Sequence, residues 1–290
     1  MANKTVNEEQ GGPDDMFTGL QTELEAGKID LRRRLLSSTT LRGGQLTQHF
    51  CLNYGMYYKF VAQTASESFD TAPAAIKNTR SRLNWVARHA LQLAQTPNPS
   101  LDFNEELLIG YFEKQAIDYH DDGEAGLGPT IASLSLGWPA PMKLRMKEKH
   151  YNGVSKAGVM VTDKPMPGCE KYSERLAAWQ ELEALKATGG EEAAATYKQR
   201  VKALPKELGL KAKGNARDVV TLQLRHGDVM LMHGADIQKY YEHAVVPDGA
   251  LRFALTCRYI DPMSLSEDIR PHVGPDSQPY DGAALPEPPK

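Results

Sequence analysis

The sequence predicts an α+β fold, with helices in the first third of the chain and strands after them. Two observations carry this expectation. From Leu107 onward, short runs of apolar residues alternate with polar ones at the two-residue period of a strand. Within this part, a stretch rich in alanine, glutamate and lysine has apolar residues at helical spacing. The pattern therefore indicates two groups of strands separated by inserted helices.

The N-terminal elements are a tail and two helices. Residues 1–15 offer little to pack and predict a flexible tail, and Leu20 to Leu36 indicates a charged helix. Residues 81–95 carry one apolar face at helical spacing, formed by Leu83, Val86, Ala90 and Leu93. On such a helix Trp85 and His89 are packing or surface residues rather than ligands.

Aromatic residues gather between these helices, in CLNYGMYYKF. Two interpretations stay open for them. They could form a lid on which a flat substrate stacks, or an ordinary strand with aromatic core contacts. The residues concerned are Tyr54, Tyr57, Tyr58 and Phe60.

The strand-rich part is interrupted by a helical insert at about residues 165–213. Ser173 is a candidate N-cap for its first helix, and Gly189-Gly190 separates the first helix from the second. The mixture of lysine and glutamate on the pair favours a solvated face over a partner site. The predicted strands are 107–112, 117–120, 130–136, 219–225, 229–233 and 252–260.

Length and composition favour one elaborated domain over residues 16–262, followed by a flexible tail over 263–290. The three cysteines are too few and too scattered for a disulfide framework, which predicts a reducing compartment. The N-terminus lacks an apolar signal segment, and no run is long enough to cross a bilayer. We expect a monomer in the cytoplasm or the nucleus, without a membrane partner.

The net charge of -3 gives the chain no overall attraction to a polyanion, so nucleic-acid binding needs a local basic patch. One candidate is the run MKLRMKEK, in which Lys143, Arg145 and Lys147 share one side of a predicted strand. The favoured interpretation of this run is a solvated outer face over a core face.

The run Tyr119-His120-Asp121-Asp122 is a candidate metal-binding segment. Because side chains alternate along an extended backbone, His120 and Asp122 point to the same side, while Asp121 points away. Two histidines and one carboxylate can occupy one face of an iron(II) octahedron and leave positions open for a cosubstrate and oxygen. The segment therefore predicts an iron site that needs one more histidine.

His243 in YYEHAVV is the best candidate for that histidine, because a strand-like apolar run follows it. A second H-x-D pair, His226 and Asp228, competes with the first. We favour the first because the second includes a turn-forming glycine that leads into an apolar strand. A structural role for His120, as a hydrogen-bonded residue beside a turn, is also open at this point.

Two arginines lie on one face of the predicted strand RFALTCRYI. Arg252 and Arg258 share that face with Ala254 and Thr256. Burying two guanidinium groups is costly unless anions pair with them, and a diacid cosubstrate would supply those anions. The alternative is that the arginines face solvent above a core face, formed by Phe253, Leu255, Cys257 and Tyr259.

Together these residues resemble the AlkB-like branch of the iron(II)- and 2-oxoglutarate-dependent dioxygenases. FNEELLIGYFEKQAIDYHDDGE resembles the family's segment of Phe-Asn, a leucine, a tyrosine and H-x-D-D. GPTIASLSLG resembles its next strand, and RFALTCR its closing R-x-x-x-x-x-R. The similarity covers residues 103–149 and 219–260, about a third of the chain.

The resemblance implies a double-stranded β-helix, a jelly-roll core of the cupin kind, with flanking helices and an inserted helical hairpin. It also implies Fe(II), 2-oxoglutarate and O2 as cofactor and cosubstrates. The implied roles are iron ligation by His120, Asp122 and His243, pairing with the distal carboxylate of 2-oxoglutarate by Arg252, a further anion contact by Arg258 and a hydrogen bond to the cosubstrate from Tyr111.

Two departures from the family pattern affect the implied contacts. Ile109 stands where the family often has asparagine, which removes one hydrogen bond to the cosubstrate. The acidic residue that often follows H-x-D-D is displaced by Gly123 to Glu124, which alters a contact to the substrate base.

The implied activity is hydroxylation of a C–H bond, and for an N-methyl group this gives demethylation with release of formaldehyde, succinate and CO2. We expect the substrate to be an alkylated base in DNA or RNA, flipped from the stack and bound by Tyr54, Tyr57, Tyr58 or Glu124. The alternatives are the same chemistry on a protein side chain or small metabolite, or a non-catalytic binding module on the same fold.

Overall fold

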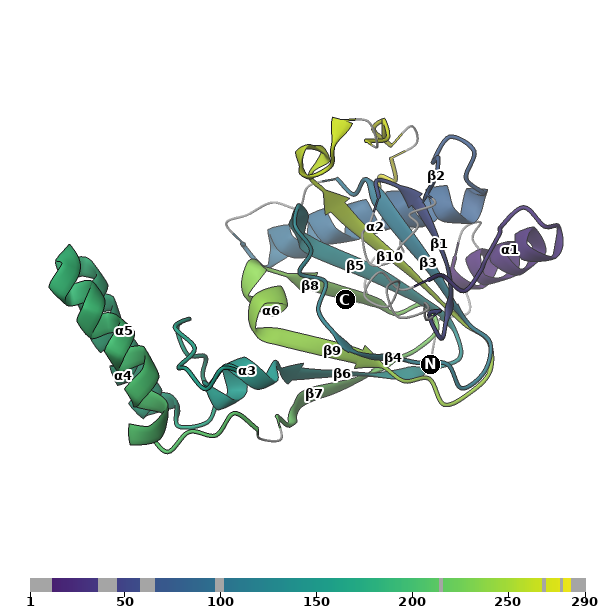
Figure 1. Cartoon of the computed structure of the whole chain (residues 1–290). Coiled ribbons are helices and arrows are strands. Elements are labelled where there is room, and N and C mark those ends of the chain that lie inside the picture. Colours follow the sequence, from purple (N-terminus) through teal and green to yellow (C-terminus); the bar gives the residue numbers. More distant parts are fainter. Residues whose placement is uncertain are drawn as a thin grey trace. The chain divides into compact units, whose positions relative to one another are not determined.

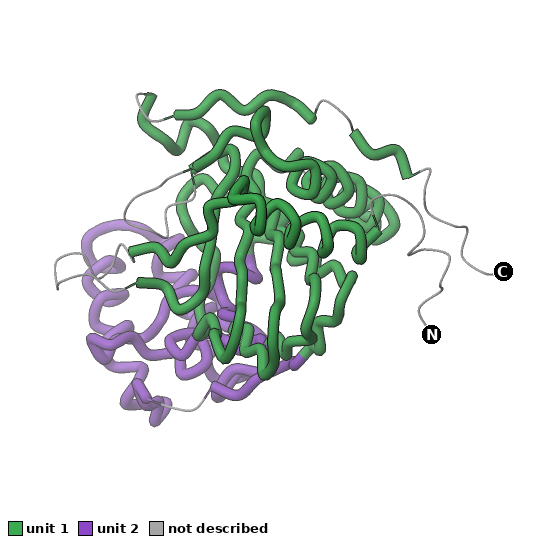
Figure 2. The backbone as a smooth tube through the Cα atoms, turned by 90° about the vertical axis from the view of Figure 1, so that its right-hand side faces the viewer, with its two compact units in different colours: residues 1–142, 222–235, 244–290 green, residues 143–221, 236–243 purple. Residues whose placement is uncertain are grey.

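The computed structural model describes residues 12–35, 46–57, 66–96, 102–213, 216–267, 270–276 and 279–282. Contacts divide the chain into two compact units, coloured separately in Figure 2. The first comprises residues 1–142, 222–235 and 244–290, and the second comprises 143–221 and 236–243. The prediction of one domain over 16–262 therefore stays a prediction.

A six-stranded sheet lies in the first unit, in the order β2-β1-β3-β10-β5-β8 (Figure 1). All neighbours are antiparallel except β1 and β2, which are parallel. β10 lies between β3 and β5, and eight of its nine residues, both arginines among them, are buried. The strands are β1 (Phe50–Gly55), β2 (Ser66–Glu67), β3 (Glu105–Tyr111), β5 (Leu127–Gly137), β8 (Val229–His233) and β10 (Arg252–Ile260).

One face of this sheet is apolar and packs against two helices, α1 (Pro13–Glu25) and α2 (Ala74–Leu93). Phe253, Leu255 and Cys257 alternate along β10 and point into this core, as the two-residue period predicts. The core is completed from the helices by Met16, Leu20, Ile76, Leu83 and Ala87, and from β3 and β5 by Leu108, Ala132, Leu134 and Leu136.

The opposite face of the same strands is polar. Ser133 on β5 and Thr256 on β10 share a hydrogen bond of 2.9 Å between their hydroxyl groups. Arg252 and Arg258 stand at the two ends of β10, with a seven-residue span of that strand between and including them. The sheet therefore has one side for the main hydrophobic core and one side that holds both arginines beside a smaller apolar cluster.

A second sheet has four strands in the order β4-β9-β6-β7. Its strands are β4 (Ile117–His120), β6 (Ala140–Met146), β7 (Asp218–Leu224) and β9 (Tyr241–Val245). β9 crosses the boundary between the units, since Ala244 and Val245 belong to the first. The two sheets with their flanking helices confirm the predicted α+β class and double-stranded β-helix core.

The helical insert lies in the second unit, as α4 (Tyr172–Thr188) and α5 (Gly190–Glu207). Their contact is built from Ala178 and Leu182 on α4 and Leu204 on α5, with Met160 from outside the pair. Gly189 and Gly190 both have positive φ, a region that suits glycine, and they form the sharp turn between the helices. The unit also holds α3 (Glu148–Asn152) and α6 (Ala235–Tyr240).

Several predicted boundaries are wrong. The first helix is α1 and ends at Glu25, whereas Arg32 and Leu35 form β-bridges, so no helix runs through Leu20 to Leu35. Residues 13–15 open that helix instead of ending a tail, because Pro13 suits a first helical turn. Ser173 lies inside α4 and makes no cap, since Lys171 holds the N-cap position.

Part of the expected C-terminal tail is ordered, and within the first unit it contacts α2. The carbonyl oxygen of Gly274 accepts a hydrogen bond from Arg80 at 3.0 Å, and the N–H of Tyr280 bonds to the hydroxyl of Ser81. A 3-10 helix, η2 (Pro262–Ser264), precedes this segment. None of the described helices combines the length and the apolar character that spanning a bilayer requires.

Candidate active site

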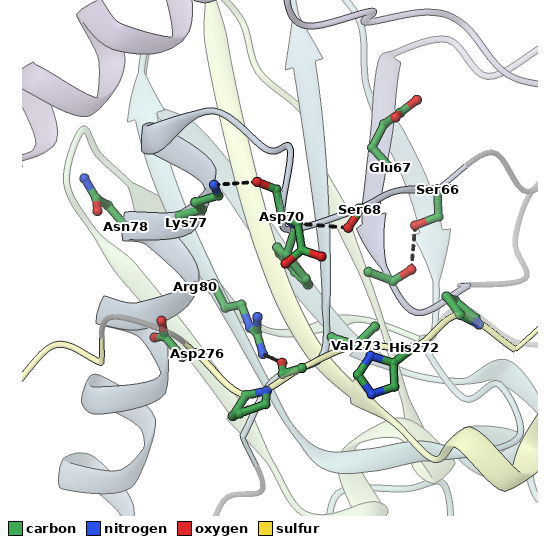
Figure 3. A pocket seen from close by; sticks show the side chains of 15 residues that line it. Ser66, Glu67, Ser68, Asp70, Lys77, Asn78, Arg80, His272, Val273 and Asp276 are labelled. Carbon is green, nitrogen blue, oxygen red and sulfur yellow. Dashed lines mark hydrogen bonds between the residues drawn. The ribbon is translucent and has the colours of Figure 1, made fainter.

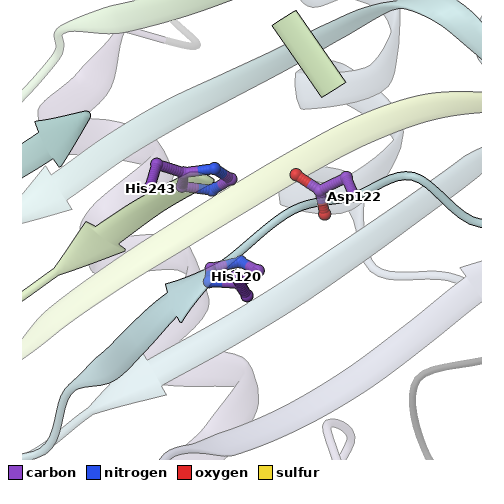
Figure 4. A group of neighbouring side chains, drawn as sticks. All are labelled: His120, Asp122 and His243. Carbon is purple, nitrogen blue, oxygen red and sulfur yellow. The ribbon is translucent and has the colours of Figure 1, made fainter. Parts of the chain in front are cut away.

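Three side chains lie together: His120 at the end of β4, Asp122 two residues later and His243 on β9 (Figure 4). Each offers one ligand atom, and these atoms lie within 4.8 Å of one another. Asp122 and His243 are buried, while His120 is half-buried. His120 ends β4 and Asp122 follows it by two residues, and both direct a ligand atom to the same place, as the predicted alternation requires. Two imidazoles and a carboxylate are a donor set suited to iron(II).

The imidazole of His120 is oriented by its own strand. Its Nδ1 lies 2.9 Å from the carbonyl oxygen of Asp118. A carbonyl only accepts hydrogen bonds, so Nδ1 carries the proton and Nε2 keeps its lone pair for a metal ion. Such a contact outside the ligand set fixes both the tautomer and the ring direction.

The competing H-x-D pair does not form a metal site. The Nδ1 of His226 accepts a hydrogen bond from the N–H of Gly137, and its Nε2 lies 2.9 Å from a carboxylate oxygen of Asp14. Asp228 accepts from the N–H of Arg225 and closes the turn before β8. The two residues therefore serve different parts of the fold, as the turn-forming glycine between them indicated.

Arg252 is a buried cation whose donors are only partly used. It is 1% exposed, and one guanidinium nitrogen, Nη2, donates to the hydroxyl of Ser135 at 3.0 Å. Within the described residues its Nε and Nη1 have no hydrogen-bond partner. Because unpaired donors on a buried charge are costly, this arrangement fits a site that an anion completes.

Tyr111 forms one wall beside that guanidinium. It pairs with Arg252 across β3 and β10, and the guanidinium carbon lies 5.3 Å from its ring centre. Burial raises the pKa of the Tyr111 hydroxyl to about 12, so it remains a hydrogen-bond donor at neutral pH. Ile109 lies on the same strand and is buried in an apolar cluster with Tyr111 and Ala254.

His49 lies beside Tyr111, and the sequence did not predict it as a site residue. Its ring centre lies 6.1 Å from that of Tyr111. Burial, together with the charges of His120 and Arg33, lowers the pKa of His49 to about 4, which keeps its ring neutral. Its sequence context gave no signal, because it follows no strand pattern and belongs to no H-x-D pair.

Arg258 was expected to contact an anion, and it does so within the protein. Its Nη1 lies 3.2 and 3.3 Å from the two carboxylate oxygens of Glu105, and its Nη2 lies 3.1 Å from Asp122 Oδ1. Burial raises the pKa of the Glu105 carboxyl to about 7, and the charge of Arg258 opposes that rise. The structure thus places Arg258 among protein carboxylates, and Arg252 is the arginine with open donors.

The predicted substrate-stacking residues fare differently. Tyr54 is wrong for this role, because it is 2% exposed and packs in the core against Phe69, so the strand interpretation holds for it. Tyr57 is half-buried against Met56 and neighbouring core residues. Tyr58 and Phe60 lie outside the described residues. Glu124 is half-buried, two residues after Asp122.

The predicted basic strand is largely engaged within the second unit. The Nε of Arg145 donates to Glu242 at 2.7 Å, and the ammonium group of Lys147 donates to the carbonyl of Gln238. Lys143 is half-buried. These contacts fit the favoured interpretation of a structural face better than a patch for polyanions.

A separate cavity of about 430 Å³ lies in the first unit, and none of the predicted site residues lines it (Figure 3). Lys77 and Arg80 point toward it from α2, and both donate hydrogen bonds to backbone carbonyls. Glu67, Asp70 and Asp276 bring acidic groups to the same space. This mixture of charges selects no class of ligand.

Comparison with known proteins assigns the family. The family model described as "2OG-Fe(II) oxygenase superfamily" matches residues 21–258, most of the chain. The chain belongs to this superfamily and is a 2-oxoglutarate-dependent dioxygenase that uses Fe(II), 2-oxoglutarate and O2. The match spans the three ligand candidates and both arginines.

Other comparisons are more distant. The solved structure of OsALKBH1 is similar with a TM-score of 0.41 and 14% sequence identity, over 85% of this chain and 92% of that chain. The search of curated proteins found no match.

Proposed function

We propose that this dioxygenase belongs to the AlkB-like branch and removes N-linked alkyl groups from bases of DNA or RNA. The single observation that carries the site is the buried guanidinium of Arg252, with two open donors. A carboxylate is the group that such a planar donor fork binds best. The order of the motifs, from Phe103-Asn104 through H-x-D-D to the final arginines, supports the substrate class.

In this proposal, His120, Asp122 and His243 hold iron, and Arg252 binds the distal carboxylate of 2-oxoglutarate. Tyr111 donates a hydrogen bond to the cosubstrate from the wall of the pocket. When bound, iron and 2-oxoglutarate supply the oxidation, in which O2 is consumed, succinate and CO2 are released and one oxygen atom enters a substrate C–H bond. The buried surroundings of Asp122 and Arg252 exclude water, which strengthens each of these charged contacts.

The product follows from the carbon that is hydroxylated. On an N-methyl group, insertion of oxygen gives an N-hydroxymethyl group, and cleavage of the C–N bond returns the N–H base and formaldehyde. A base in a duplex must leave the stack first, at a cost of roughly a few kcal/mol.

A second candidate keeps the chemistry and changes the substrate to a protein side chain or a small metabolite. Specific observations favour it. Arg145 and Lys147 are engaged by protein groups, the net charge is -3, and Tyr54 offers no stacking surface. The two candidates differ in whether phosphate contacts contribute to binding.

The proposal is tested with methylated single- and double-stranded oligonucleotides, Fe(II), 2-oxoglutarate and ascorbate. We expect formaldehyde and succinate in equal amounts, and oligonucleotide binding that weakens steeply as salt is raised. Turnover of a peptide or metabolite pool, with no release from any base lesion, would overturn the nucleic-acid assignment and favour the second candidate.

Two histidine variants make a matched control. His120→Ala should abolish both metal binding and formaldehyde release, because a ligand is lost. His226→Ala should leave metal binding unchanged, since this ring contacts Gly137 and Asp14 instead. The reverse result would move the metal to the competing pair.

A further inference from the structure

A buried ion pair, Glu105 with Arg258, contacts Asp122, one of the ligand candidates. Glu105 is 0% exposed, and its two oxygens face Nη1 of Arg258 at 3.2 and 3.3 Å. The Nη2 of the same guanidinium reaches Asp122 Oδ1 at 3.1 Å. One guanidinium therefore joins two buried carboxylates, one of which is a ligand candidate.

The fold fixes this arrangement through the backbone. Glu105 opens β3 and lies directly opposite Arg258 in the β3–β10 pairing. Glu105 and Arg258 therefore face each other on the polar side of the sheet, whereas the adjacent Glu106 is opposite Cys257 and belongs to the other face. The strand places the two neighbouring glutamates in different surroundings.

Burying an ion pair carries a desolvation cost, so we expect such a pair where it has a role that two apolar side chains could not fill. Desolvating two charges removes most of the gain from their attraction, so a buried pair is weak evidence for stability. Without Glu105, the Nη1 of Arg258 would lose its two contacts to a carboxylate. With Glu105 in place, one side of the fork is used, and the other side is directed at Asp122.

We propose that Glu105 is a positioning residue for the metal site: it holds Arg258 so that Nη2 fixes one oxygen of Asp122. This inference rests on the proposed role of Asp122 as a metal ligand. Contacts of this kind, one step beyond the ligands, orient a ligating carboxylate and reduce its freedom to rotate.

The test is Mn(II) binding to the full chain carrying Glu105→Gln, measured by electron paramagnetic resonance. We expect the Mn(II) affinity to fall about 10- to 100-fold, the usual effect of losing such a partner. With Mn(II) saturating, the affinity for 2-oxoglutarate should change less than about threefold, because Arg252 is untouched. The visible absorption of the Co(II)-loaded protein should shift, since Asp122 is no longer held.

Glu106→Gln is the matched control. It makes the same chemical change one residue along the strand, on the face away from the site, and should leave Mn(II) affinity and the Co(II) spectrum unchanged. Equal effects of the two variants would assign both to general loss of packing and overturn the proposal.

A double-mutant cycle with Arg258→Met tests whether Glu105 acts through Arg258. In the Arg258→Met background, Glu105→Gln should cause little further loss of Mn(II) affinity, because the connecting guanidinium is absent. Losses that multiply independently would contradict the proposed route. If Glu105→Gln does not fold, Glu105→Asp keeps the charge on a shorter arm, and unchanged Mn(II) affinity in that variant overturns the proposal.

The metal site and the role of Glu105 can fail separately. If His120→Ala retains Mn(II) affinity, the metal-site assignment itself fails. If His120→Ala loses Mn(II) while Glu105→Gln binds it as the unmodified protein does, the metal site stands and the role of Glu105 is refuted.

Discussion

Arg252 shows at the scale of one residue how a strand position becomes a binding group. Its aliphatic stem is enclosed by the sheet, and its guanidinium lies beside Tyr111 and Ser135. Burial lowers the pKa of this arginine, yet an arginine keeps its charge in practice. A buried, permanently charged group with unused hydrogen-bond donors is stabilised when an anion binds to it.

We predict that Arg252→Met weakens 2-oxoglutarate binding about 10- to 100-fold, since hydrogen bonds to charged groups contribute roughly 1.5–3 kcal/mol. Mn(II) affinity should stay within about threefold, because methionine fills the space and touches no ligand. Titration calorimetry on the Mn(II)-loaded protein measures both constants. A loss of Mn(II) that equals the loss of 2-oxoglutarate would show that Arg252 supports the metal site instead.

At this scale the sequence predicted the residues whose spacing carries geometry. The two-residue period brought His120 and Asp122 to one side, and placed Arg252 on the polar face of its strand. Glu105 was missed, because a glutamate within an apolar strand gives no sign of its partner until the register of β3 and β10 is known. For Tyr54 a lid and a strand with core contacts both stayed open, because an aromatic pattern does not show which face is covered.

At the scale of elements, the α4–α5 pair is held by a small apolar contact. Leu182 is buried and, together with Ala178 on the same helix, it packs in one cluster with Leu204 of α5. The outward faces carry ion pairs such as Lys186 with Glu183, which lie on the surface. Surface pairs of this kind contribute little, so the apolar contact determines the stability of the hairpin.

Leu182→Ala should therefore lower the free energy of unfolding by about 2–5 kcal/mol, through lost burial and the cavity that remains. Glu183→Ala, one residue along the same helix, should change it by less than about 1 kcal/mol. Urea unfolding followed by circular dichroism measures both. Similar losses in the two variants would mean that the hairpin is not stabilised by its apolar seam.

The inserted helices and four strands of the main sheet, β3, β5, β8 and β10, followed from periodicity. The first helix did not, because its boundary depends on Pro13 and on a β-bridge between Arg32 and Cys51. The order of strands in the sheets could not be predicted from the sequence pattern either. Pairing between distant segments is set by long-range packing, which the local pattern does not contain.

At the scale of the whole molecule, buried histidines make stability depend on pH. His150 is 3% exposed, and burial lowers the pKa of its imidazole to about 4. In the unfolded chain the group takes up its proton near its ordinary value of 6.5. Between these values the unfolded state binds more protons, so the stabilising contribution is complete above pH 6.5 and is lost as the pH falls toward 4.

We predict that His150→Gln reduces the slope of unfolding free energy against pH between 6.5 and 4, by up to about 1.4 kcal/mol per pH unit. His49 contributes in the same direction and remains in the variant. Urea titrations at closely spaced pH values give the slope, with parallel curves above pH 7 as the internal control. An unchanged slope would show that His150 titrates alike in both states.

The two faces of β10 have a consequence for how the enzyme can fail. Odd-numbered positions such as Phe253 point into the hydrophobic core, and even-numbered positions such as Arg252 point to the opposite face. A slip of the strand by one residue would turn the guanidinium groups toward the hydrophobic core. The same slip would turn Phe253 toward the face that carries Arg252 in the native register. Misregistered molecules would therefore lose both their stability and the placement of Arg252. Every chain that folds in the native register has this guanidinium in position.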